Sequence, residues 1–124
     1  MTGKERLYFG LGLAAFAVAK ADGKIDQEER NKLHDIVVNS LNCQDEGINV
    51  SEIIFHVLGK HDNFEIENLY DLAIKELTDY KSYLTNDMRS DFPAILEKVA
   101  RSVEPITPEE RQLIERFRSD INYI

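Results

Sequence analysis

Five carboxylates near two predicted helix starts are the residues of this sequence best suited to chemistry. Asp22, Asp26 and Glu29 stand close together early in the chain, and Glu104 and Glu110 stand close together near its end. Carboxylate oxygens are the ligands that hard divalent cations prefer, so this set predicts binding of Ca²⁺ or Mg²⁺. The alternative, which the local pattern favours, is structural: Asp26 and Glu29 cap a helix, and Asp22 is a surface acid beside the turn.

The stretch from Asp22 to Glu29 resembles the second half of an EF-hand loop, with its glycine, hydrophobic residue and final glutamate in place. However, Val18 and Lys20 stand where such a loop needs its first two oxygen ligands. Both residues belong to a predicted helix. The sequence therefore argues against an EF-hand, and a bound cation would be held in another geometry.

The other reactive side chains form no catalytic or zinc-binding pattern. His34, His56 and His61 lack the paired second cluster of a zinc site, and Cys43 is the single cysteine, which excludes an internal disulfide. The sequence contains no nucleophile elbow, phosphate-binding loop or zinc-protease helix. We therefore expect a protein that is not an enzyme; the alternative is a small enzyme assembled from distant residues.

The carboxylates belong to a unit that the sequence contains twice. Residues 99–114 align with residues 18–33 without a gap, at an offset of 81 positions (99 minus 18). The identical pairs are Val18/Val99, Ala19/Ala100, Ile25/Ile106, Glu28/Glu109, Glu29/Glu110 and Arg30/Arg111.

Each copy carries the signals of a helix start. Asp26 with Glu29, and Thr107 with Glu110, have the spacing of a capping box, in which the cap side chain and the glutamate each accept a backbone hydrogen bond. Pro108 suits the first position of a helix, where its missing N–H costs nothing. Both copies therefore predict a helix, a tight turn and a second helix.

Hydrophobic periodicity predicts an all-α fold: a compact bundle of about six to seven helices in a single domain over residues 1–124. The first helix is apolar nearly all round, which is typical of a helix buried in a core, and Gly10 lies on a small-residue face that lets a neighbour approach. Pro93 is expected in the first turn of the fifth helix or at a kink. The expected helices cover about residues 4–21, 27–41, 51–60, 65–80, a segment ending near 103, and 108–121.

Charge is distributed unevenly along the chain. The formal net charge is −8, and residues 45–79 hold nine acids against two lysines. Such a balance repels phosphate backbones, so we expect no nucleic-acid binding. A divalent cation or a protein partner with a basic surface fits better, although solvated acidic helix faces explain the same composition.

The apolar stretch from Leu7 to Ala19 mimics a signal peptide but is too short to span a bilayer. Its end forms part of the internal repeat, which favours a helix of the folded domain. The sequence thus predicts a cytoplasmic protein that does not interact with a membrane, since the single cysteine also suits a reducing compartment.

The residues from Ala17 to Glu29 resemble the repeated signature of TerB-like domains: an alanine-rich helix end, Ala-Asp-Gly, a hydrophobic residue and a glutamate in the next helix. This all-helical family includes tellurite-resistance TerB and the N-terminal region of the co-chaperone DjlA. The resemblance implies a role in tellurite resistance and stress response, and metal binding by Asp22, Glu29 and Glu110. In the second copy Val103 stands where the family has its aspartate, which weakens that half of the site.

Together these features predict a stress-associated interaction domain that binds a cation at the turn between the first two helices. The alternative function is a structural or oligomerising module without metal, because self-association would also suit a small helical domain.

Overall fold

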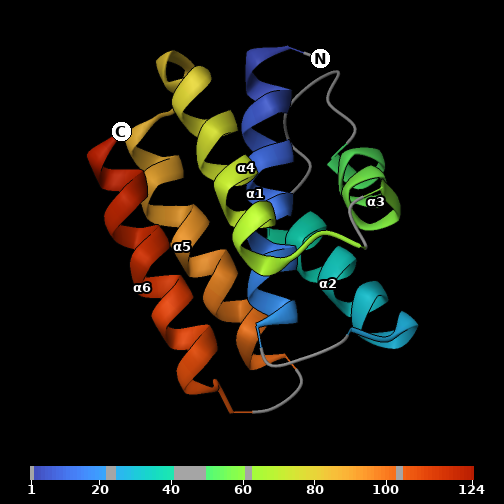
Figure 1. Ribbon diagram of the computed structural model, residues 1–124. Helices are drawn as coiled ribbons and strands as arrows, with labels where there is room; N and C mark the ends of the chain where they lie inside the picture. Colours follow the sequence, from blue (N-terminus) through green and yellow to red (C-terminus); the bar gives the residue numbers. More distant parts are fainter. Residues whose placement is uncertain (1, 22–24, 41–49, 61–62, 103–104) are drawn as a thin grey trace.

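The computed structural model describes residues 2–21, 25–40, 50–60, 63–102 and 105–124, which form six α-helices, one short 3₁₀ helix and segments that connect them. No strand occurs in these ranges, so the predicted all-α bundle is confirmed (Figure 1). The elements are α1 (Gly3–Lys20), α2 (Gln27–Ser40), α3 (Val50–Lys60), α4 (Ile66–Asp79), η1 (Lys81–Tyr83), α5 (Asn86–Arg101) and α6 (Pro108–Tyr123).

Helix α1 forms the centre of the bundle. Every residue from Leu7 to Val18 is buried, and α1 packs against each of the five other α-helices, most extensively against α4 (Figure 1). A helix with no polar face needs such a surrounding because each side must be removed from water. Among the described residues, no helix combines the length and hydrophobicity that a membrane-spanning segment requires.

Glycine at two positions of α1 allows its neighbours to come close. A Cβ atom added at Gly10 would lie 3.2 Å from the Ala73 carbonyl oxygen of α4, and one at Gly12 would lie 2.8 Å from Cδ1 of Ile54 in α3. The small-residue face predicted from Gly10 is thus the face on which α4 packs.

Helices α5 and α6 form an antiparallel pair that packs on α1 (Figure 1). Thr85 caps α5 by accepting a hydrogen bond from the Met88 backbone N–H at 3.1 Å, and this cap fixes the helix start at Asn86. Pro93 therefore lies buried in the helix interior, so the first of its two expected places, the first turn, is wrong, and a kink stays a prediction. Since proline has no N–H, the Arg89 carbonyl loses its usual donor within the helix.

Candidate functional site

The two helix junctions that carry the predicted carboxylates lie at the same end of the bundle (Figure 1). Helix α1 ends with the Ala21 N–H donating to the Val18 carbonyl at 3.2 Å, and α5 ends with the Ser102 N–H donating to the Val99 carbonyl at 3.2 Å. The next helices begin at Gln27 and at Pro108, again 81 positions apart (108 minus 27). The helix ends that flank the two junctions therefore match in spacing and in their backbone hydrogen bonds, while residues 22–24 and 103–104 between them lie outside the described residues.

A capping box closes the start of α2. The Glu29 N–H donates to Asp26 Oδ1 at 2.8 Å, and the Asp26 N–H donates to Glu29 Oε1 at 3.4 Å. Asp26 is exposed and Glu29 is half-buried. These two bonds use one oxygen of each carboxylate, which leaves the second oxygen of each outside the box.

The second capping box, at the start of α6, is more enclosed. The Glu110 N–H donates to Thr107 Oγ1 at 3.2 Å, while Glu110 Oε1 accepts from the Thr107 N–H at 2.9 Å and from its hydroxyl at 3.1 Å. Glu110 is buried, with 6% of its surface exposed. The same motif thus produces an open pair of carboxylates at the first junction and a covered cap with a single carboxylate at the second.

The predicted cation ligands are brought together only in part. Asp26 and Glu29 are neighbours, but the described residues contain no group of three or more His, Cys, Asp or Glu that could hold a metal ion. Asp22 and Glu104 lie outside the described residues. Hard cations need several oxygen ligands, and among the described residues the first junction brings only Asp26 and Glu29 together, whereas Glu110 is committed to its cap.

The sequence predicted that the three histidines and the cysteine form no zinc site. The structure describes only His34 and His56 of these four residues. His34 Nδ1 lies 3.1 Å from Asp35 Oδ1, and the His56 ring packs near Phe9 with ring centroids 6.1 Å apart. Cys43 and His61 lie outside the described residues.

A small groove at the junction end was not predicted. It measures about 240 Å³ and is lined by Ala21 at the first junction, Glu109 and Arg116 of α6, and Glu67 of α4. The Arg116 guanidinium donates to both oxygens of Glu67, at 3.0 and 3.1 Å. The groove lies between the two junctions, because Ala21 of the first and Glu109 of the second both line it.

Beside this groove lies a partly buried polar pair. The hydroxyl of Tyr70, whose side chain is buried, donates to Asp120 Oδ2. Burial first, and then the bond to Asp120, raise the pKa of the Tyr70 phenol above its usual range. The phenol therefore stays protonated and acts here as a structural donor.

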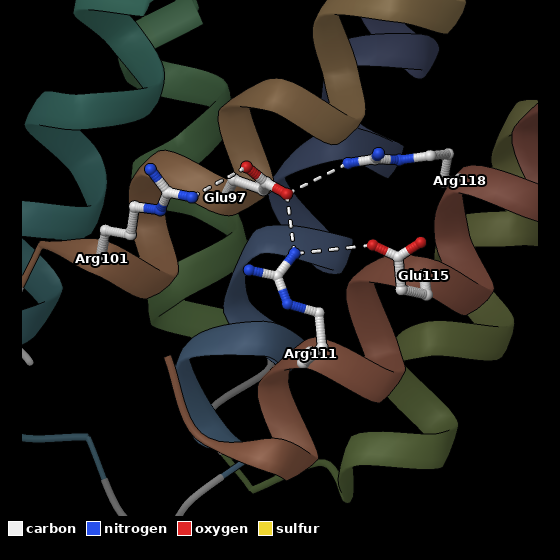
Figure 2. Close-up of polar contacts among 5 residues, drawn as sticks. All are labelled: Glu97, Arg101, Arg111, Glu115 and Arg118. Atoms are coloured by element: carbon white, nitrogen blue, oxygen red, sulfur yellow. Dashed lines mark hydrogen bonds and ion pairs between the residues drawn. The ribbon is translucent and has the colours of Figure 1, made fainter. Parts of the chain in front are cut away.

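A second polar cluster that the sequence did not predict connects α5 and α6 (Figure 2). Glu97 Oε1 accepts from Arg111 at 2.7 Å and from Arg118 at 3.2 Å, while Glu97 Oε2 lies 3.6 Å from Arg101. The hydrogen bond from Arg111, followed by the charges of the three arginines, lowers the pKa of Glu97. Burial opposes this shift.

Comparison of the chain with protein-family profiles, with curated proteins and with solved structures gave no match. The resemblance to TerB-like domains therefore rests on the residues of the repeat, and kinship with that family stays a prediction.

Proposed function

We propose that this chain is a TerB-like binding domain of the cytoplasm that acts in stress response without catalysing a reaction, and that the junction end of the bundle is its binding end. The observation that carries the proposal is the pair of junctions with matching backbone hydrogen bonds and matching capping boxes at one end of the fold. The residues that carry the family resemblance, Ala17 to Glu29 and their weaker second copy, span these two junctions in the sequence.

We further propose that the first junction takes a divalent cation. Asp26 and Glu29 would supply their outward oxygens, and Asp22 precedes them in the sequence. The second junction is assigned a structural role, because Glu110 is buried in its cap. A protein partner with a basic surface would suit the net charge of −8.

The cation proposal can be tested with variants that keep the cap. Asp26→Asn and Glu29→Gln remove both charges, while asparagine still caps a helix and glutamine still completes a capping box. Glu28→Gln changes an exposed neighbour by the same charge and serves as the control. Each protein would be titrated with Ca²⁺ and Mg²⁺ to millimolar concentration and followed by amide NMR shifts.

The expected result is a saturable shift at residues 25–29 in the natural protein and in Glu28→Gln that is lost in the Asp26→Asn/Glu29→Gln double variant. The absence of a shift in the natural protein, or an equal shift in the double variant, would refute the cation site.

The wider role predicts that the native cell loses tellurite tolerance when the gene is deleted and regains it from a plasmid copy. An unchanged tolerance would contradict that role.

A further inference from the structure

A surface groove lies between α5 and α6, away from the junctions. It measures about 570 Å³, within the range of roughly 300–1,000 Å³ found for small-molecule sites. Its lining is mostly polar and includes Asn86, Arg89 and Ser90 of α5, and Arg118 and Asn122 of α6. Because Asn86 begins α5 and Asn122 lies in the last turn of α6, the groove extends towards the end of the pair opposite to their junction.

Positive charge collects along this groove although the protein as a whole is acidic. Glu97, which also lines the groove, is surrounded by the guanidinium groups of Arg101, Arg111 and Arg118 (Figure 2). Glu115 adds a second carboxylate at 3.5 Å from Arg111. Among the residues that line the groove, Arg89 and Arg118 outnumber the single carboxylate of Glu97, so the lining keeps a positive excess that an anion would reduce.

The two arginines of the groove are positioned by single bonds that leave most of their donors for other partners. Arg118 Nη2 donates to Glu97 Oε1 at 3.2 Å, and Arg89 Nη1 donates to the Ile121 carbonyl. A guanidinium has five N–H donors, and each of these bonds accounts for one. Within the described residues, the buried Arg118 Nε has no hydrogen-bond partner, so the edge that it shares with Nη2 is only half used.

We propose that this groove binds a small molecule bearing an oxyanion, either a carboxylate or a phosphate group, between Arg89 and Arg118. Planar guanidinium donors match the paired oxygens of both groups and form charge-assisted hydrogen bonds with them. Asn86, Asn122 and Ser90 supply neutral partners for the rest of the ligand, and Glu97 supplies an acceptor for a ligand hydroxyl or amine. This site is separate from the proposed cation site and does not depend on it.

The test uses inorganic phosphate and succinate as probes, added to the full chain at constant ionic strength. Amide NMR shifts at Ser90 and Asn122 report on the groove, whereas shifts at residues 25–29 report on the first junction. Arg89→Gln and Arg118→Gln each remove one proposed contact. Arg116→Gln removes the same charge from another face of α6, where Arg116 pairs with Glu67, and is the matched control.

We expect saturable shifts at Ser90 and Asn122 with at least one probe; the probe that saturates at the lower concentration identifies phosphate or carboxylate as the preferred group. Each glutamine variant in the groove should raise the Kd about tenfold, since one charge-assisted hydrogen bond is lost, and Arg116→Gln should leave it unchanged. Shifts that are absent, or that respond equally to all three variants, would overturn the proposal. If Arg118→Gln unfolds, Arg118→Lys replaces it, because lysine keeps the charge but lacks the planar, paired donors of the guanidinium. Unaltered binding by Arg118→Lys would contradict the role of those paired donors.

Discussion

The Arg116 guanidinium carbon lies 4.2 Å from the centre of the Tyr70 ring, so α6 is held to α4 by a cation stacked on an aromatic face. The same arginine pairs with Glu67, and the hydroxyl of the same tyrosine donates to Asp120. Ring, cation and two carboxylates therefore form one continuous contact between the two helices.

Tyr70→Phe should destabilise the fold by about 2 kcal/mol, because the ring is kept while Asp120 loses a donor in a partly buried place. Urea unfolding at neutral pH measures the loss. Tyr83→Phe removes a hydroxyl from a side chain that is 55% exposed, and should leave stability unchanged. Equal free energies of unfolding for Tyr70→Phe and the natural protein would show that the hydroxyl contributes nothing.

The contribution of the Tyr70 phenol to stability should also be visible in the pH dependence of unfolding. The folded protein raises the Tyr70 pKa above its ordinary value of 10.0, so the phenol stabilises the fold fully below that pH. As pH rises above about 10, the unfolded chain loses the proton first and stability falls. Tyr70→Phe should therefore lose less stability than the natural protein between pH 9 and 11, by urea unfolding. Parallel curves would contradict this.

The repeat could be predicted from the sequence because its signals are local. A capping box needs residues three positions apart, so Asp26 with Glu29 and Thr107 with Glu110 determine their helix starts almost without tertiary contacts. The burial of Leu7 to Val18 could likewise be predicted, because a helix with no polar face is stable in a folded domain only when all its sides are covered.

The polar clusters could not be predicted because their partners meet only through packing. Arg116 and Glu67 are 49 residues apart, and Glu97 meets Arg118 across two helices whose rotation depends on the whole core. The different burial of Glu29 and Glu110 could not be predicted either: the two residues occupy equivalent positions in the repeat, but Glu29 is half-buried and Glu110 is buried.

Glu97→Gln should lower stability at neutral pH by about 1 kcal/mol, because three arginines then face each other without their shared carboxylate. The folded state lowers the Glu97 pKa, so this contribution is present above the ordinary value of 4.5 and disappears as pH falls below it. The difference between variant and natural protein should hence shrink in acid. Glu115→Gln, at a more exposed position, is the control; a loss as large as that of Glu97→Gln would argue against a special role for Glu97.

Alanine at two glycines should change stability in opposite directions. Gly10→Ala would place a Cβ 3.2 Å from the Ala73 carbonyl oxygen and 3.3 Å from Glu76 Cβ, which are fixed parts of α4. The resulting strain should outweigh the gain in helix propensity and destabilise by about 1 kcal/mol. Gly59→Ala meets no atom within 4 Å and should stabilise by up to about 1 kcal/mol. Thermal unfolding of both variants checks the signs, and a stabilised Gly10→Ala would mean that α4 can move away from α1.

The two capping glutamates should differ in their contribution to stability although they occupy equivalent places in the repeat. Glu110→Ala leaves the Thr107 N–H and hydroxyl without their acceptor in a covered site, so it should cost about 2 kcal/mol. Glu29→Ala leaves one N–H near solvent, where water replaces the longer 3.4 Å bond, and should cost about 0.5 kcal/mol.

Glutamine at either position keeps an acceptor for the box and provides the matched control, so Glu29→Gln should be close to neutral. Glu110→Gln should recover part of the loss seen in Glu110→Ala, because its amide oxygen still accepts from Thr107. Urea unfolding of the four variants gives the comparison. Equal losses for the two alanine variants would show that the second junction gains nothing from its burial.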